Sequence, residues 1–267
     1  MTKPASVLTE RFDEALAYAA DVHRAQMRKG TSIPYLSHLM AVASTVLEDG
    51  ADETTAIVAL LHDAVEDQGG DARLADIRSR FGDDVAFAVS ECSAEDKSKT
   101  TDWRPRKERY IAQMRTALPP ALHVSLADKL HNLRSIVDDY RRVGDDLWQR
   151  FNAPDAGALV WYYGSLIDVY DGRYDVPNRQ RIYELRRLLA TLQELLRGPK
   201  CWRCGSADVI PILLGLPGPE LMRAEAAGEV ILLGCIPSDD MKNCHCRNCG
   251  YEWEDPAYAE DEDEDYE

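Results

Sequence analysis

The chain carries an adjacent histidine and aspartate, His62 and Asp63, followed one helical turn later by two carboxylates, Glu66 and Asp67. A neutral imidazole and hard carboxylate oxygens are ligands that suit a divalent cation, and such a cation activates a bound water for hydrolysis. Residues three and four apart share one face of a helix, so these side chains are expected to crowd one helix end. The spacing predicts a metal site, with a solvated helix end as the alternative because short charge runs are commonly exposed.

The helix that would position these residues is predicted over residues 53–67. Apolar residues recur from Ala56 to Val65, Asp52 is suited to cap the N-terminus, and Gly69-Gly70 ends the pattern. Four polar groups beside a buried apolar stripe carry a desolvation cost on the order of several kcal/mol per ion unless a cation or partners compensate it. A bound cation would supply that compensation.

Two other predicted helices offer further ligands. His38 opens a helix expected over 38–48, and Asp128 lies in a helix expected over 121–142, where Asn132 follows it by four residues on the same face. An aspartate and an asparagine there could serve as a metal ligand and a substrate-orienting amide. The alternatives are an ordinary N-terminal helix position for His38 and an ion pair with a neighbouring basic residue for Asp128.

Four separated motifs carry these residues. They are His23-x-x-Gln26-x-Arg28-Lys29-Gly30 leading to Pro34-Tyr35-x-x-His38; His62-Asp63-x-x-Glu66-Asp67; the Phe81-Gly82 turn with Glu91-Cys92-Ser93-x-x-Asp96-Lys97; and Leu126-Ala127-Asp128-Lys129-Leu130-His131-Asn132-x-Arg134. Over residues 9–170 this order resembles the HD phosphohydrolase superfamily. More narrowly, it is similar to the Rel/Spo-type alarmone hydrolases, which remove the 3′-pyrophosphate of guanosine tetraphosphate and pentaphosphate.

The resemblance implies a division of roles. It implies a manganese ion held by His38, His62, Asp63 and Asp128. It implies that Glu66 and Asp67 position or deprotonate the attacking water. It also implies a substrate-binding set in which cationic side chains cover the base and phosphates, an amide contacts the nucleotide sugar or its 3′ substituent, and a lysine faces the pyrophosphate: Arg28, Lys29, Tyr35, Asn132 and Lys97.

Two departures from the family pattern bear on the function. Leu39 stands where the family usually has proline after its first ligand histidine, and nothing after residue 200 has the length or composition of an alarmone synthetase. We therefore expect hydrolysis without synthesis. Two alternatives stay open: a phosphohydrolase acting on another nucleotide, including nicotinamide dinucleotide phosphate, and a non-catalytic nucleotide sensor or adaptor.

The chain before residue 198 reads as helix after helix, with glycine and proline turns between them. Beyond the helices already named, the predicted segments are 12–28, 72–80, 84–91, 104–117, 155–170 and 178–197. We expect an all-helical HD-domain bundle over residues 1–197. Aromatic residues of the 155–170 segment are expected in its core, with base stacking by Trp161 or Tyr163 as the alternative.

After Gly198-Pro199 the helical period stops and two Cys-x-x-Cys knuckles appear, each followed by glycine: Cys201, Cys204, Cys246 and Cys249. Two such knuckles supply four thiolates to one tetrahedral zinc. We therefore predict a small zinc-ribbon-like β domain over 198–251 with a structural zinc, and free or redox-active thiols as the alternative. Short β-favouring runs at 208–214 and 229–233 fit this domain. Cys244 is left over, although it could compete with Cys246 for the metal.

Charge and hydropathy exclude several classes of protein. The net charge is −16 over 267 residues, and residues 252–267 hold ten acidic and no basic residues, so an acidic, disordered tail is expected there. Nucleic acid is an unfavourable partner because no basic footprint accompanies this charge. The tail or the ribbon could recruit a protein partner. No apolar run is long enough to span a membrane, and residues 1–11 lack a signal-peptide core, so we expect a cytoplasmic protein acting on a small-molecule nucleotide.

Overall fold

The computed structural model describes residues 8–93, 102–214, 217–233 and 242–255. These residues form two compact units: the first comprises the described parts of 1–139 and 145–190, and the second those of 140–144 and 191–267. The predicted boundary at residue 198 lies close to the change between the units but stays a prediction. Among the described residues, no helix is both long and apolar enough to cross a membrane.

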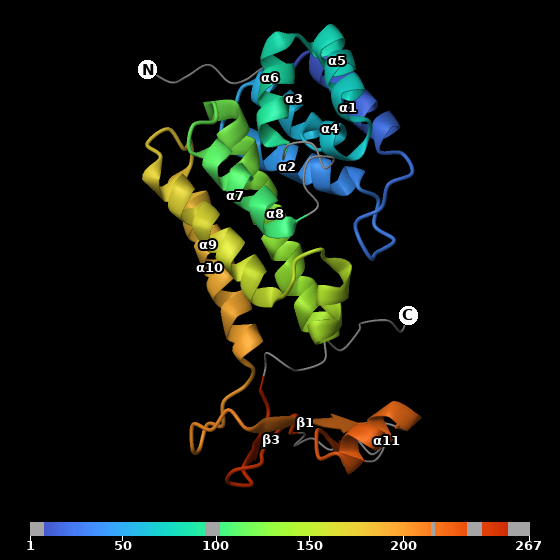
Figure 1. Cartoon of the computed structure of the whole chain (residues 1–267), viewed down its shortest axis with the longest axis vertical. Helices are drawn as coiled ribbons and strands as arrows, with labels where there is room; N and C mark the ends of the chain where they lie inside the picture. The colour runs from blue at the N-terminus through green and yellow to red at the C-terminus, as the bar shows by residue number, and fades with distance from the viewer. Residues whose placement is uncertain (1–7, 94–101, 215–216, 234–241, 256–267) are drawn as a thin grey trace. The chain divides into compact units, whose positions relative to one another are not determined.

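The first unit is built of helices, as Figure 1 shows, and the predicted all-helical fold is confirmed. In chain order its helices are α1 (Glu10–Val22), α2 (Leu36–Glu48), α3 (Glu53–Leu61), α4 (Ala64–Asp67), α5 (Gly70–Phe81), α6 (Asp83–Cys92), α7 (Trp103–Met114), α8 (Pro119–Val143), a 3-10 turn η1 (Gly144–Arg150), α9 (Ala156–Gly172) and α10 (Arg179–Arg197). The final turns of α8 and α10 cluster with the second unit.

Helix α3 lies at the centre of the core. Every residue from Thr55 to Leu61 is buried, and the helix packs against α1, α2 and α6. The predicted cap is confirmed, because the Asp52 carboxylate accepts a hydrogen bond from the backbone N–H of Thr55 at 2.9 Å. This buried helix therefore places its C-terminal end, which the histidine–aspartate pair directly follows, in the interior of the unit.

The prediction of a single helix over residues 53–67 is wrong. Helix α3 ends at Leu61, and α4 begins only at Ala64, so His62 and Asp63 form the turn between them. Their side chains explain the break: His62 Nδ1 hydrogen-bonds the Ala59 carbonyl, and Asp63 adopts φ −96° and ψ −5°. Side-chain bonding to the backbone competes with helix continuation, and this backbone region is common among active-site residues.

The first predicted helix also ends earlier than expected. Helix α1 stops at Val22, and the segment up to residue 35 forms a loop in which Met27 and Pro34 pair as an antiparallel bridge. Gly30 takes a positive φ of 73° within this loop, a conformation that favours glycine. Arg28, predicted to be the last residue of that helix, therefore lies on a loop together with Lys29.

The aromatic residues of α9 mostly serve the core, as predicted. Tyr162, Tyr163 and Tyr170 are buried, and Tyr170 shares a hydrogen-bonded chain with Ser125 and Tyr110. Trp161 is only partly buried, and the guanidinium of Arg104 lies 3.2 Å from its ring centroid.

The second unit contains a four-stranded sheet in the order β2-β1-β3-β4. Its strands are β1 (Val209–Leu214), β2 (Ile231–Leu233), β3 (Cys244–Cys246) and β4 (Glu252–Trp253). Strands β1 and β2 run parallel and are joined through helix α11 (Pro219–Ala226), which was not predicted, whereas the other pairs are antiparallel. The predicted strands at 208–214 and 229–233 are confirmed.

The acidic tail begins later than predicted. Glu252 and Trp253 form β4, and Trp253 is buried beside the cysteines. Asp255 is also held, because its backbone N–H donates to Asn243 Oδ1 at 2.7 Å. The predicted disorder of the remaining tail concerns residues 256–267, which lie outside the described residues.

Candidate active site

Four side chains from three places in the first unit converge on one point. His38 comes from the first turn of α2, His62 and Asp63 from the turn after α3, and Asp128 from the middle of α8. The Nε2 atoms of the two histidines lie 3.6 Å and 3.0 Å from Asp63 Oδ2, and 3.2 Å and 3.8 Å from Asp128 Oδ1. Residues separated by up to 90 positions in the chain thus place their donor atoms in one small volume.

This arrangement fits a divalent cation. Atoms that share an ion at about 2.0 to 2.2 Å lie about 3 to 3.6 Å from one another, close to the distances here. The Nε2 atoms of His38 and His62 are fully buried, and neither has a hydrogen-bond partner among the described residues. Buried nitrogen lone pairs of this kind are costly unless a ligand binds them. His38, His62 and Asp128 also form a group whose donor atoms all lie within 4.8 Å of one another.

The negative charges of Asp63 and Asp128 favour a cation at the cluster. Burial by itself would raise the pKa of Asp63 and of Asp128. The imidazoles of His62 and His38 hold the pKa of Asp63 well below its usual range, and Lys129 together with the same imidazoles does so for Asp128. Burial acts in the opposite direction on His62, whose pKa is nevertheless raised well above its usual value by Asp63 and Asp128. The partly buried carboxylate of Asp63 and the buried carboxylate of Asp128 therefore stabilise positive charge at the point where the histidine nitrogens meet.

A second layer of hydrogen bonds orients the four side chains. His62 Nδ1 lies 2.8 Å from the Ala59 carbonyl and carries a proton there, so Nε2 is the nitrogen that can bind a cation when the cation displaces its proton. His38 Nδ1 lies 2.9 Å from His131 Nδ1, and the Tyr35 hydroxyl donates to Asp63 Oδ2 at 2.5 Å. Burial and the charge of Asp63 raise the pKa of Tyr35 well above its usual range, so the hydroxyl keeps its proton.

Asp128 is held by its neighbours on α8. Lys129 Nζ makes a short ion pair with Asp128 Oδ2, and Asn132 Nδ2 donates to Oδ1 at 2.5 Å. Arg28, from the loop after α1, donates to Asn132 Oδ1 at 3.1 Å. The loop that carries Arg28 is thereby tied to the helix that carries Asp128, and both lie beside the cluster.

The remaining predicted residues occupy different surroundings. Glu66 is half-buried and Asp67 is exposed, one turn beyond the cluster in α4, and Gln26 Nε2 donates to Asp67 Oδ2 at 2.9 Å. Lys29 points elsewhere, because its ammonium donates to Asn152 Oδ1 at 3.2 Å. Lys97 lies outside the described residues.

Sequence reasoning missed two cationic or polar partners of the site. His131 was assigned no role from the sequence, yet its Nδ1 lies 2.9 Å from His38 Nδ1, a contact between α8 and α2 that helical periodicity does not reveal. Lys107 of α7 lies 4.6 Å over the ring of Tyr162, and burial together with Lys129 lowers its pKa to about 8. The charges of Glu66 and Asp128 also act on Lys107.

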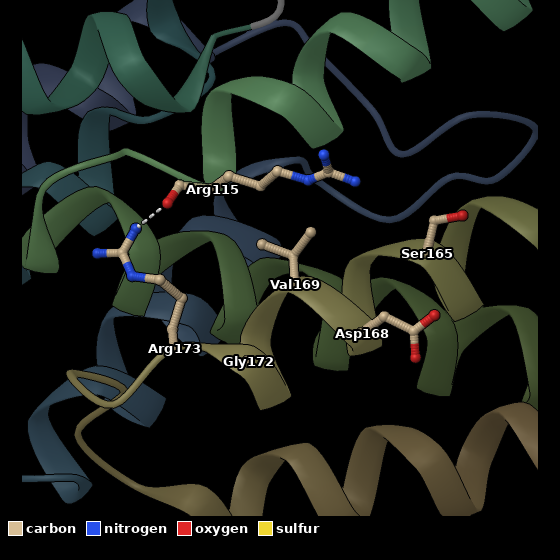
Figure 2. A pocket seen from close by; sticks show the side chains of 6 residues that line it. All are labelled: Arg115, Ser165, Asp168, Val169, Gly172 and Arg173. Atoms are coloured by element: carbon tan, nitrogen blue, oxygen red, sulfur yellow. Dashed lines mark hydrogen bonds between the residues drawn. The ribbon is translucent and has the colours of Figure 1, made fainter.

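The first unit also has a hollow of about 430 Å³ that is lined by other residues. It is formed by α9 and the end of α7, and Figure 2 shows Arg115, Val169 and Arg173 together with Ser165 and Asp168. Arg173 Nη1 donates to the Arg115 carbonyl at 2.9 Å, so this arginine ties the chain after α7 to the end of α9. None of the predicted site residues lines the hollow.

The cysteines of the second unit form a separate cluster. The sulfurs of Cys201, Cys204, Cys246 and Cys249 all lie within 4.8 Å of one another. Two of the Sγ–Sγ distances are 3.5 Å and 3.6 Å, close to the ~3.8 Å expected for thiolates around one tetrahedral zinc at ~2.3 Å. The glycine after each knuckle, Gly205 and Gly250, has a positive φ.

The chemistry of these sulfurs suits a metal. The backbone N–H of Ser206 and the amide of Asn248 lower the pKa of the Cys204 thiol to about 6, so a thiolate is favoured. Cys244 does not belong to the cluster; it is buried against Trp253, and burial raises the pKa of its thiol to about 11. Cys92 is buried in the first unit.

Comparisons with known proteins agree with the geometry. The chain is 40% identical over 130 residues to the guanosine-3′,5′-bis(diphosphate) 3′-pyrophosphohydrolase MESH1 of Drosophila melanogaster, which covers 47% of this chain and 69% of that protein. It is 30% identical over 175 residues to a probable enzyme of the same name from Synechocystis, over 62% of this chain but only 22% of that protein.

Solved structures give the same result. A metazoan ortholog of SpoT, described as hydrolysing ppGpp, aligns with a TM-score of 0.56 and 28% identity over 70% of this chain and 97% of its own. A protein of Listeria monocytogenes aligns with a TM-score of 0.51 and 31% identity, over 61% and 99% of the two chains. The HD domain model matches residues 15–158, which is more than half of the chain. This match, which spans all four converging side chains, shows that the chain belongs to the HD-domain family.

Proposed function

We propose that this protein is a metal-dependent hydrolase that removes the 3′-pyrophosphate of guanosine 3′,5′-bis(diphosphate). The observation that carries the proposal is the meeting of His38, His62, Asp63 and Asp128 at one buried point with two histidine nitrogens unpartnered among the described residues. The names of the relatives support the choice of nucleotide. The chain spans 69% of the first of these relatives and much less of the longer ones, so the substrate is part of the proposal.

The four residues would hold one divalent cation, for which we propose manganese. When bound, such an ion lowers the pKa of a coordinated water and offsets negative charge on the phosphoryl oxygens. The protein prepares this position before any ion binds: Ala59 fixes the tautomer of His62, and Tyr35 holds one oxygen of Asp63. Soft sulfur ligands are absent from this donor set, carboxylate oxygens suit manganese, and imidazole binds several divalent transition metals.

The chain's other residues would carry out the reaction around that position. Glu66 and Asp67 accept the proton of the attacking water, whose oxygen adds to the phosphorus attached to the 3′ oxygen. The bond from that phosphorus to the 3′ oxygen then breaks, and the 3′ oxygen takes up the proton that the carboxylate accepted and leaves as the 3′ hydroxyl. The products are guanosine diphosphate and pyrophosphate. Arg28 and Asn132, already hydrogen-bonded to each other, orient the nucleotide.

The placement of the basic residues modifies the predicted substrate set. Arg28, Tyr35 and Asn132 lie beside the cluster through their hydrogen bonds, which supports their proposed roles. Lys29 would have to leave Asn152 to reach a substrate. Lys97 stays a proposal from the sequence alone, and Lys107 adds a positive charge on the α7 side.

The second unit is proposed to be a zinc-ribbon-like domain with a structural zinc. All four ligand positions would be filled by the thiolates of its two knuckles, so no open position would be left for catalysis. We also place the protein in the cytoplasm, where thiols stay reduced and available to a metal. A protein partner of this unit or of the acidic tail remains a proposal from the sequence.

The test uses metal-stripped protein reloaded with manganese. It is assayed against guanosine tetraphosphate, other phosphorylated nucleotides and nicotinamide dinucleotide phosphate, beside an Asp63→Ala variant. We expect pyrophosphate release from guanosine tetraphosphate by the wild type, with loss of at least ~10³-fold in the variant since an essential ligand is removed. Binding without turnover would favour the sensor, and turnover of another nucleotide in preference would overturn the choice of substrate.

A further inference from the structure

We propose that Gln26 is a positioning residue: its side-chain amide fixes the orientation of the Asp67 carboxylate, and His23 and Gln68 fix the amide in turn. The inference rests on the proposed function, in which Asp67 handles the proton of the attacking water. It assigns a role to the His23 and Gln26 of the first sequence motif, which no ligand or substrate contact yet explains.

Gln26 joins two segments that lie far apart in the sequence. It follows the end of α1, and its Nε2 donates to Asp67 Oδ2 in α4 at 2.9 Å. Its backbone is fixed as well: its N–H donates to the His23 carbonyl at 3.0 Å, and its own carbonyl accepts from the N–H of Tyr35 at 2.9 Å. The amide therefore projects from a backbone anchored at both its donor and its acceptor.

The direction of the amide follows from its surroundings. An ionised carboxylate only accepts hydrogen bonds, so the group facing Asp67 must be the NH2 end of Gln26. The oxygen end then faces two nitrogens, His23 Nδ1 at 2.7 Å and Gln68 Nε2 at 2.5 Å. Rotating the amide by half a turn would set oxygen against carboxylate and nitrogen against donors, so three contacts define one orientation.

The surroundings of His23 favour its Nδ1 as the hydrogen-bond donor to Gln26. Its side chain is buried, it stacks on Tyr35 with ring centroids 5.3 Å apart, and burial lowers its pKa. A neutral imidazole that donates from Nδ1 carries its lone pair on Nε2. A half-turn of the ring would keep its stacking on Tyr35 but set a carbon in place of Nδ1 against Gln26, so the hydrogen bond to Gln26 favours the observed ring orientation.

We expect the hydrogen bond between Gln26 and Asp67 to affect catalysis rather than the stability of the fold. Asp67 is exposed, and a solvent-exposed hydrogen bond contributes little to the free energy of unfolding. A base, in contrast, must lie within hydrogen-bond reach of the proton it takes, and small displacements of a reacting group reduce the rate strongly. The hydrogen bonds from His23 to Gln26 and from Gln26 to Asp67 hold the exposed Asp67 carboxylate in place at the edge of the proposed metal site.

The first test compares Gln26→Met, which removes the amide at similar length, with Gln26→Glu, which keeps the shape and sets a carboxylate against Asp67. We expect kcat to fall roughly tenfold in the first variant and more in the second, with KM within about twofold, since a positioned base contributes ~10² to 10⁴ to the rate. Gln113→Met is the matched control: this partly buried glutamine donates to the Glu91 carbonyl, away from the site.

A double-mutant cycle separates positioning from general structural damage. If Gln26 acts through Asp67, then Gln26→Met has no further effect on kcat in an Asp67→Ala background. Full additivity of the two substitutions would overturn the inference, as would an unchanged kcat in Gln26→Met. Thermal unfolding of each variant shows that the native fold is kept.

One readout does not depend on turnover. The side-chain amide signal of Gln26, identified by its loss from the NMR spectrum of Gln26→Met, should shift in Asp67→Ala and stay in place in Gln113→Met. A signal insensitive to Asp67 would overturn the contact even if the enzyme is active. Wild-type protein that turns over no nucleotide while the signal does respond would instead defeat the proposed function and leave the contact established.

Discussion

His38 and His131 face each other through their Nδ1 atoms, which lie 2.9 Å apart. One of these nitrogens must donate and the other accept. Burial, followed by the neighbouring ring of His38, lowers the pKa of His131 to about 4, so at neutral pH the His131 ring is uncharged and can accept. His38 then carries its proton on Nδ1 and directs the lone pair of Nε2 toward the carboxylates of Asp63 and Asp128. His131 is thus an outer partner that selects the tautomer required of a ligand.

The first prediction concerns this pair. His131→Phe keeps a ring of similar shape but removes the acceptor, so His38 loses the partner that fixes its tautomer. We expect the affinity for manganese to fall ~10 to 100-fold, which is the usual cost of losing an outer partner of a histidine ligand. Calorimetric titration of metal-stripped protein measures it, and an affinity within twofold of the wild type would show that the contact has no such role.

The second prediction concerns Lys129. Its ammonium pairs with the buried carboxylate of Asp128, so Lys129→Met leaves that charge without its partner when no metal is bound. The free energy of unfolding of metal-free protein should fall by about 3 to 5 kcal/mol, the scale for breaking a buried ion pair. Manganese should raise the Tm of this variant more than that of the wild type. Equal shifts on adding metal would contradict the idea that lysine and metal neutralise the same carboxylate.

The third prediction separates the two kinds of cysteine in the second unit. Cys204→Ser should abolish the binding of one zinc per chain, since four thiolates are needed for a closed tetrahedral site. Cys244→Ser is the matched control, because Cys244 lies two residues from a proposed ligand but packs on Trp253 instead. Zinc content by atomic absorption decides the matter. Loss of zinc from the Cys244 variant alone would reassign the ligand set.

The fourth prediction concerns pH. Burial lowers the pKa of His123, which lies among Asp49, Arg181 and Asp52, with its Nε2 3.3 Å from Asp49 Oδ2. Below pH ~6.5 the unfolded chain therefore takes up a proton that the folded histidine resists, and the folded state loses stability as the pH falls.

His123→Gln keeps an N–H donor but does not titrate. Between pH 7.5 and 5.5 the wild type should lose stability relative to this variant by at most about 1.4 kcal/mol per pH unit. Urea unfolding at a series of pH values gives both curves. Parallel curves would show that His123 does not contribute to the acid sensitivity of the fold.

The residue types of the candidate site could be predicted from the sequence because its ligands are chemically distinctive. A histidine next to an aspartate, with carboxylates one turn later, is unusual on an apolar helix, and the paired Cys-x-x-Cys knuckles are just as specific. The helical fold followed from the 3.6-residue period of apolar residues and from glycine and proline turns.

Contacts between distant segments could not be predicted in this way. The break at His62 depends on a hydrogen bond to Ala59, and periodicity carries no record of it. The pairing of His131 with His38 depends on how α2 and α8 pack. Helix α11 was missed because it is short, lies among proline and glycine residues, and has no buried residue to mark a periodic face.

The most direct measurement of the central claim is anomalous diffraction from crystals of the manganese-loaded protein. We expect one peak bonded to His38 Nε2, His62 Nε2 and oxygens of both Asp63 and Asp128, at about 2.0 to 2.3 Å. A peak at another place in the first unit, or one from which His62 or Asp128 stays outside bonding distance, would contradict it.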